Sequence, residues 1–417
     1  MEILQWINRI LGVLFFLCYA YQFFYLPIPH MKKDKPHRPA QAHRYAVLIC
    51  ARNEEAVIAD LLESLRRQTY DMGLVSVFVM ADNCTDRTAQ TAREAGAAVY
   101  ERFDTERVGK GYALQALLEH IRADCPEGFD GYFVFDADNV LKQDYIEQMN
   151  RTFSDGYEII TSYRNSKNYG SNWISAGYGL WFLRESEYLN HARMLLHTSC
   201  AVSGTGFLFS DRVLREQGGW PFHLLIEDIE FSVWHILKGY RIGYCHDAML
   251  YDEQPMTFRQ SWRQRLRWSR GYLQVLRRYG GKMLVGMARG SFSCYDMCMN
   301  ILPAFVLSLL SAVCNTAAVI AALACGGSVW TALLPVLQTM GSMYLTLFVL
   351  GGITTLTQWR NIPAGTWKKL LYTLTFPLFM FTYIPISISA LFIDCGWKPI
   401  THSVRADALP AELLKPQ

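Results

Sequence analysis

Three groups of acidic and amide side chains each follow a short apolar run of the kind that forms a buried strand. They are residues 51–55 (Ala-Arg-Asn-Glu-Glu) after the run 45–50, residues 82–86 (Asp-Asn-Cys-Thr-Asp) after 75–81, and residues 136–138 (Asp-Ala-Asp) after 132–135. Ligands of parallel sheets bind beyond the carboxyl ends of the strands, where such residues meet. Carboxylates gathered at one edge of a sheet therefore predict a polar ligand that is held with a metal ion.

Asp136 and Asp138 support this prediction most strongly, because both follow directly after an apolar run. Mg²⁺ is typically held by one or two carboxylates together with substrate phosphates. The pair is thus suited to bind a diphosphate through Mg²⁺ or Mn²⁺ and to neutralise it as it leaves. An Asp-x-Asp sequence is common by itself, and Asp86 has the plain alternative role of a helix cap.

Two later segments contain further reactive groups. Residues 203–206 (Ser-Gly-Thr-Gly) form a small turn that lets a ligand approach the backbone closely. Glu227 and Asp228 open a helix that runs to about Leu237. Asp228 is a candidate base, and its alternative role is that of a helix N-cap.

A basic and aromatic segment, residues 258–279, predicts another helix. Gln264, Arg267 and Trp268 lie at i, i+3 and i+4 and hence on one face. That face offers an amide, a guanidinium suited to phosphate oxygens and an indole able to stack on a sugar ring. A different stripe could lie on the membrane surface; it consists of Trp262, Leu266, Leu273 and Leu276.

The elements that must position these groups alternate between strands and helices from about residue 45 to residue 289. The expected strands are 45–50, 75–81 and 132–135, and the expected helices are 53–68, 85–95 and 110–121. This alternation favours a mostly parallel sheet that is covered by helices.

Long apolar runs lie at the two ends of the chain, at residues 10–26, 297–325, 330–356 and 370–393. About 20 such residues span a bilayer, so we expect one retained N-terminal anchor and about three C-terminal spans. Basic residues near the runs favour a cytoplasmic central domain: Lys32, Lys33, Lys35 and Arg38 before it, and Arg277, Arg278, Lys282 and Arg289 after it.

Loop composition agrees with this orientation. The loop 326–328 is neutral, as expected outside, whereas the next loop has Arg360, Lys368 and Lys369, as expected inside. Counting spans then places both termini outside, although the tail beyond Asp394 contains Lys398 and Arg405.

Charge and cysteine content narrow the function classes. The net charge of +3, from 40 basic and 37 acidic residues, gives no indication of nucleic-acid binding. Eleven cysteines are scattered without metal-ligand spacing, as in a reduced cytoplasmic domain.

With these residues in place, the chain resembles the inverting family 2 glycosyltransferases of GT-A fold. Within them it is similar to the membrane-bound branch of cellulose, hyaluronan and poly-N-acetylglucosamine synthases. The resemblance rests on Asp82, the Asp136/Asp138 pair, the Glu227-Asp228 pair and Gln264-x-x-Arg267-Trp268 in the family's order. It implies an N-terminal transmembrane helix (1–30), a cytoplasmic α/β GT-A domain (31–257), amphipathic interfacial helices (258–294), C-terminal transmembrane helices (295–395) and a tail (396–417).

The resemblance also implies a role for each matching residue. Asp228 would be the general base and Asp138 would bind Mg²⁺ or Mn²⁺. Donor-binding residues would be Glu54 and Asp82 at the base, Asp136 at the ribose, Lys110 near the nucleotide, and Gln264 and Arg267 at the pyrophosphate. The acceptor side would be formed by Trp268, Glu227, Gly204 and Thr205.

The implied reaction transfers a glucose-type or N-acetylglucosamine-type sugar from a UDP-sugar to a growing polysaccharide at the plasma membrane, among membrane lipids. An accessory subunit or a homo-oligomer fits the small membrane part. The chain departs from the family at Ile226, where many members have Thr, and in a turn without Cys, and we find no gating loop.

Three alternatives remain open. The first is single addition to a lipid-linked acceptor, which the modest number of spans favours. The second is a catalytically silent sensor, which predicts the loss of Asp138, Asp228 or Trp268, although all three are present. The third is a transporter, against which the few, uncharged spans argue.

Overall fold

The computed structural model describes residues 2–324, 329–396 and 400–416; the loop 326–328 and Lys398 lie outside these ranges. Its centre is one sheet with the strand order β3-β2-β1-β4-β7-β6-β8-β5. The strands are β1 (Tyr45–Ala51), β2 (Val75–Asp82), β3 (Ala98–Arg102), β4 (Gly131–Asp136), β5 (Val140–Leu141), β6 (Ile159–Ser166), β7 (Phe207–Ser210) and β8 (Gly243–Asp252). Strands β7 and β5 run against the others, so the predicted mostly parallel sheet is confirmed.

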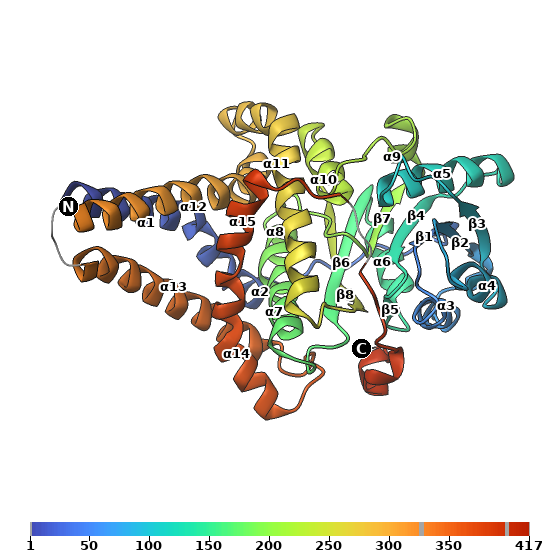
Figure 1. Ribbon diagram of the computed structural model, residues 1–417. Coiled ribbons are helices and arrows are strands. Elements are labelled where there is room, and N and C mark those ends of the chain that lie inside the picture. The colour runs from blue at the N-terminus through green and yellow to red at the C-terminus, as the bar shows by residue number, and fades with distance from the viewer. Residues whose placement is uncertain (1, 325–328, 397–399, 417) are drawn as a thin grey trace.

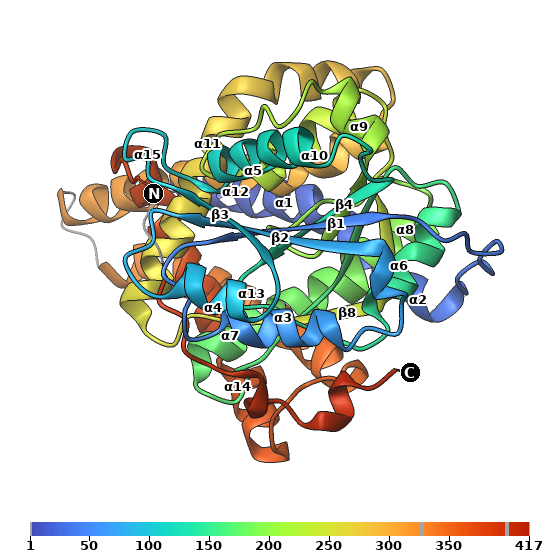
Figure 2. The same cartoon turned by 90° about the vertical axis from the view of Figure 1, so that its right-hand side faces the viewer.

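Alternation of buried side chains along β1 explains how helices cover both faces of the sheet. Ala46 and Leu48 face the cluster that includes α5 (Lys110–Asp124) and α10 (Glu227–Leu237). Val47 and Ile49 face the cluster that includes α3 (Ile58–Arg66), α4 (Thr88–Glu94) and α6 (Tyr145–Ser154). Figure 2 shows the sheet between α5 and α10 on one side and α3 and α4 on the other.

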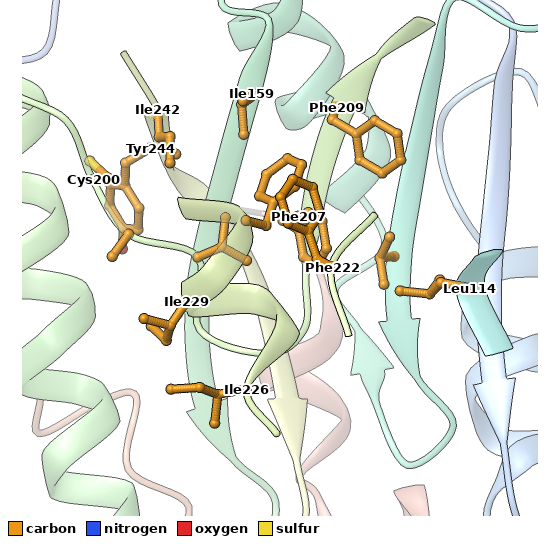
Figure 3. Packing of buried hydrophobic residues seen from close by; sticks show 14 of the residues in the cluster. Leu114, Ile159, Cys200, Phe207, Phe209, Phe222, Ile226, Ile229, Ile242 and Tyr244 are labelled. Atoms are coloured by element: carbon orange, nitrogen blue, oxygen red, sulfur yellow. The ribbon is translucent and has the colours of Figure 1, made fainter. Parts of the chain in front are cut away.

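The start of α10 is fixed by the core beneath it. Ile226 and Ile229, which flank Glu227 and Asp228, belong to the same buried cluster as Phe207 (Figure 3). Each large apolar side chain contributes about 1.5–3 kcal/mol when it is fully buried. This anchorage holds the two acidic residues at a fixed place beside the sheet.

Smaller helices and turns complete the domain. They are α2 (Ile28–Met31), η1 (Met72–Leu74), α7 (Trp173–Arg184), the π-helix η2 (Glu185–His191), α8 (Ala192–Leu195), α9 (Asp211–Glu216), η3 (Ala406–Ala408) and η4 (Ala411–Leu414). The unbroken series α7-η2-α8 packs beside β6 and β8.

Long apolar helices extend from one end of the sheet domain. They are α1 (Glu2–Tyr25), α12 (Phe292–Ala324) and α13 (Val329–Thr357), which point away from the sheet in Figure 1. The helices α14 (Thr366–Phe381) and α15 (Tyr383–Phe392) instead run across the base of these three, beside α11 (Phe258–Ala288). Among the described residues, four segments are long and apolar enough to cross a membrane: Arg9–Met31, Phe292–Ala324, Val336–Thr357 and Thr366–Phe392.

The segment 258–288 forms the single helix α11, and its apolar stripe packs partly against another helix. Leu266 packs on Ile386 and Ala390 of α15, with Trp262 and Leu273 at the edge of this cluster. The local pattern correctly indicated an apolar face, but α15, more than a hundred residues later, covers it.

Residues 400–416, which we call the C-terminal strap, return to the sheet domain (red in Figure 1). The backbone N–H groups of Ser403 and Val404 donate to Glu253, and Ala406 N donates to Asp60 Oδ2 at 2.6 Å. Further along, the Gln143 N–H donates to Leu414 O at 2.9 Å. The strap thus packs against the sheet domain. Counting of the membrane spans, by contrast, placed the C-terminus on the opposite side of the membrane from this domain.

Candidate active site

Lys110 joins two parts of the predicted site. It is the first residue of α5, and its Nζ donates to Asp136 Oδ1 at 2.5 Å and to Gly204 O at 2.7 Å. Burial disfavours the charge of Lys110, but the carboxylates of Asp136 and Glu227 outweigh it and raise its pKa. Lys110 is therefore a fixed positive charge at the end of β4.

The turn 203–206 brings the backbone close to Asp228. Gly204 has φ 80°, and a Cβ at this position would lie 3.8 Å from Asp228 Oδ2. Thr205 Oγ1 donates to Asn139 Oδ1 at 2.5 Å and accepts from the Asp136 N–H at 2.9 Å. The turn thereby connects Asp136 with the start of α10, and glycine at 204 leaves space in front of the Asp228 carboxylate.

Glu227 and Asp228 lie in the first turn of α10, where Ile226 occupies the N-cap position without a side-chain cap. Asp228 is thus not the N-cap residue. Burial, with the nearby Asp228, raises the pKa of Glu227 to about 7. Burial likewise raises the pKa of Asp228. A carboxylate whose pKa approaches the working pH is an effective general base.

A second cluster surrounds Asp138 and Glu54. His402, in the C-terminal strap, places Nδ1 at 2.9 Å from Glu54 Oε1. Burial works against protonation of His402, but Asp138 and Glu54 raise its pKa to about 10. His402 is therefore an imidazolium held between two carboxylates.

Asp138 is only 5% exposed, and its Oδ2 accepts from the Glu253 N–H at 2.7 Å. Burial alone would raise its pKa, but the charges of His402 and Lys167 outweigh burial and lower it. Asp138 is thus ionised. Nearby, burial raises the pKa of Asp252 to about 6.

Arg164, which no motif indicated, connects the two clusters. Its Nε donates to Asp252 Oδ2 at 2.6 Å and its Nη1 donates to Ser203 O at 2.8 Å. The guanidinium lies 3.7 Å from the centroid of the Phe182 ring. Arg164 stands near the end of β6. We did not expect this strand from the sequence, although the apolar residues at its start could have indicated it.

The predicted residues of α11 line a separate wall of the site. Gln264 Oε1 is buried without a hydrogen-bond partner among the described residues. Arg267 Nη1 donates to Leu225 O, just before α10, at 3.3 Å. The Trp268 ring packs edge-on against Tyr178, with centroids 5.8 Å apart. The buried amide oxygen is free to accept from a ligand.

Asp82 ends β2 at the same edge of the sheet, with β1 between it and Asp136 at the end of β4. It pairs with Arg102, from Oδ1 to Nη1 at 2.5 Å. No hydrogen bond or ion pair between described residues joins Asp82 to Asp136 or Asp138. Asp86 accepts from the Thr88 N–H at 3.0 Å at the start of α4, but the N-cap position there belongs to Arg87, so Asp86 is not the N-cap residue.

The donor set suits a hard divalent cation at Asp138. Asp138 is ionised, Asp252 lies close enough to interact with it, and both are oxygen ligands. His402 and Lys167 supply positive charge beside these acids and partly neutralise them. A cation here would therefore share its charge with the phosphates of a ligand, and the two oxygen donors fit Mg²⁺ or Mn²⁺ held in that way.

Comparison with known proteins agrees with this geometry. Residues 43–271, more than half of the chain, match the family described as "Glycosyltransferase like family 2". The chain belongs to this family. The expected GT-A sheet, with apolar helices before and after it, is confirmed by the structure of the mannosyltransferase PcManGT from Pyrobaculum calidifontis in complex with GDP-Man and Mn²⁺. That likeness covers 93% of this chain and 99% of the other, with a TM-score of 0.62 and 17% identity.

Curated relatives differ in what they make. The probable glycosyltransferase YdaM of Bacillus subtilis (strain 168) is 24% identical over 279 residues, which are 62% of this chain and 61% of that protein. A beta-monoglucosyldiacylglycerol synthase of Nostoc sp. is 26% identical over 63% of this chain and 56% of its own length. A poly-beta-1,6-N-acetyl-D-glucosamine synthase of Staphylococcus aureus is 25% identical over 55% of each chain. The chain thus spans less than two thirds of the length of these relatives.

Proposed function

We propose that the protein transfers a glucose-type or N-acetylglucosamine-type sugar from a UDP-sugar to an acceptor hydroxyl at the membrane surface, with inversion at the anomeric carbon. One observation carries this proposal. The Asp228 carboxylate faces the narrow turn at Gly204, next to the Lys110–Asp136 pair at the end of the sheet.

Each residue then has a chemical task. Asp228 accepts the proton of the acceptor hydroxyl as that oxygen forms a bond to the anomeric carbon. The bond from this carbon to the diphosphate breaks, and the diphosphate leaves with the electron pair. Lys110 and Arg267 offer fixed positive charge to the leaving group. Mg²⁺ or Mn²⁺ at Asp138 would neutralise further negative charge on the diphosphate.

For the acceptor we propose a lipid or a lipid-linked sugar. Trp268 and its neighbours Tyr178 and Phe182 form one apolar cluster with Phe379 and Met380 of α14. The acceptor wall is therefore continuous with the apolar helices, and a lipid-borne hydroxyl can reach it from the membrane surface. Polymer extension is the second candidate, favoured by Gln264, Arg267 and Trp268 as in polymerising members of the family.

The test uses lipid-reconstituted protein, radiolabelled UDP-glucose, UDP-N-acetylglucosamine and GDP-mannose, Mg²⁺ or Mn²⁺, and sizing of the product. A lipid-sized product from one UDP-sugar supports the proposal, and a high-molecular-weight product supports polymer extension. Transfer from GDP-mannose alone contradicts the choice of nucleotide. The variant Asp228→Asn should lose transfer by at least about a hundredfold while still binding UDP, because general-base catalysis contributes roughly 10²–10⁴-fold. Unchanged turnover would remove Asp228 as the base.

We also propose that α1, α12 and α13 cross the membrane, whereas α14 and α15 lie along its cytoplasmic surface. The end of α13 is fastened to the sheet domain, since Tyr163 donates to Gln358 Oε1 at 2.8 Å and Asn165 donates to Asn361 O at 2.8 Å. The strap after α15 is fastened to the same domain. Because both points lie on the same side of the membrane, the chain between them must cross the membrane an even number of times. A surface-bound α14–α15 pair, which does not cross it, meets this condition.

The helix pair has a local reason to lie flat. Pro377 and Pro385 each lack a backbone N–H, and the helix breaks at Thr382 between them. An epitope fused to the C-terminus should react with antibody in inside-out vesicles and stay protected in right-side-out ones. Reaction from the outside would contradict this arrangement and require a third C-terminal crossing.

A further inference from the structure

A cluster of metal-binding side chains lies away from the catalytic edge, where the π-helix η2 meets β8. Glu187 and His191 stand four residues apart on η2, and His246 stands on β8. One ligand atom of each residue lies within 4.8 Å of the corresponding atoms of the other two. Insertions of π-helix and β-bulges both occur frequently at functional sites. Strand β8 shows such an irregularity in its pairing with β6, opposite Ser162 and Tyr163.

We propose that Glu187, His191 and His246 form a zinc site, with water as the fourth ligand. Two imidazoles and one carboxylate are a ligand set of Zn²⁺ sites that keep an open position. Glu187 and His191 are 6% and 5% exposed, whereas the His246 side chain is 33% exposed, so solvent reaches the cluster from one side.

The spacing of the ligand atoms fits a single ion. At a tetrahedral Zn²⁺ with bonds of about 2.0 Å, neighbouring ligand atoms are about 3.3 Å apart. Here His246 Nε2 lies 3.0 Å from Glu187 Oε2, and His191 Nδ1 lies 3.6 Å from Glu187 Oε1. The two imidazole rings stack with their centroids 4.2 Å apart, and each has one nitrogen beside a different oxygen of the Glu187 carboxylate.

Outer carboxylates orient both rings for this role. Asp34 Oδ2 lies 3.1 Å from His191 Nε2, and Asp247 Oδ1 lies 3.4 Å from His246 Nδ1. Metal-bound histidines almost always donate their second ring N–H to such a partner. The buried His191 Nδ1 lies 3.6 Å from Glu187 Oε1, beyond hydrogen-bond distance, and has no hydrogen-bond partner within the part of the chain that the structure describes. This nitrogen without a hydrogen bond is the second observation that points to a ligand.

The alternative is a purely ionic cluster with both histidines protonated. Two imidazolium protons and one Zn²⁺ carry the same charge. When Zn²⁺ binds, it therefore replaces these two protons, which are released. Zinc affinity should therefore rise with pH.

The site is separate from the predicted catalytic cation. His246 and Asp252 are six residues apart on β8, roughly 15–20 Å along a strand. Asp34 belongs to the segment between α2 and β1. A zinc ion here would thus fasten the segment that follows the N-terminal helix to the sheet domain.

The test uses full-length protein in detergent, without a histidine tag, stripped with a chelator and dialysed against Zn²⁺. We expect one zinc per chain, a higher melting temperature with Zn²⁺, and tetrahedral Co²⁺ absorption after substitution. His246→Gln should weaken zinc binding by more than tenfold and abolish the thermal shift. His120→Gln, which changes an exposed histidine stacked on Tyr100 at α5, and Asp138→Asn at the catalytic edge should keep both.

Two results would overturn the proposal. One is the absence of zinc binding by the unmodified protein at micromolar concentration, which leaves the ionic cluster as the explanation. The other is equal zinc binding by His246→Gln. Because His246 is partly exposed, this variant is expected to fold, and its circular dichroism serves as the check. Every readout is independent of sugar transfer.

Discussion

The strongest electrostatic prediction concerns the Glu227–Asp228 pair. Burial and Asp228 raise the pKa of Glu227 to about 7, so the two carboxyl groups share a proton just below neutral pH. The proposed reaction needs Asp228 ionised, and a proton on the pair should therefore slow transfer. The rate should rise with pH and level off above an apparent pKa of about 7.

The magnitude follows from one titration. One unit below an apparent pKa of about 7, roughly one tenth of the molecules carry the ionised pair, so the rate at pH 6 should be about one tenth of the plateau. In Glu227→Gln the like charge beside Asp228 is gone, and the pKa of Asp228 falls. The ratio of the rate at pH 6 to that at pH 8 should then increase by up to about tenfold.

The assay is the initial rate of sugar transfer at saturating donor between pH 5 and pH 9, with UDP binding measured by calorimetry at each end. The surface variant Glu119→Gln, on the exposed side of α5, should keep the pH dependence of the unmodified protein. If Glu227→Gln shows an unchanged pH profile, this pair does not control the ionisation of the base, and the reasoning is refuted.

Two further predictions concern the cluster at Asp138. Asp138→Asn should weaken UDP binding in the presence of Mg²⁺ or Mn²⁺ by about tenfold or more and leave binding in EDTA unchanged, as measured by calorimetry; an equal loss in EDTA contradicts the metal role. His402→Gln removes a positive charge from between Glu54 and Asp138. UDP binding in EDTA should therefore weaken several-fold while added Mg²⁺ restores it, whereas His37→Gln should change neither; identical metal dependence in both variants argues against a charge role for His402.

Local sequence patterns predicted those strands and helices that have a clear apolar run or a clear helical periodicity of their own. The strand expected at 75–81 is β2 (Val75–Asp82), and the helix expected at 110–121 is α5 (Lys110–Asp124). The helix expected at 53–68 begins only at Ile58, because residues 53–57 form a turn in which Asn53 has φ 57°. Periodicity showed which side chains are buried there but not where the backbone changes conformation.

Contacts between distant segments could not be predicted in this way. The sequence singled out Glu54 and Asp138 but not His402, which lies 348 residues beyond Glu54. It likewise gave α11 an apolar stripe without identifying α15 as its partner. A pattern reports how much of a surface is apolar or charged, whereas the partner is decided by the folded chain. The roles assigned to the site residues remain predictions until the variants above are measured.

The C-terminal strap bears on when this enzyme becomes active during its synthesis. Domains generally fold as units while the chain grows from its N-terminus, so the sheet and Asp228 can form before α12 to α15 have left the ribosome. His402 reaches Glu54 only after those helices have been made and the chain has returned to the sheet domain. Under the proposed function, newly made protein should therefore complete the cluster of Glu54, Asp138 and His402 only after α12 to α15 have been made, which delays consumption of the sugar donor until then.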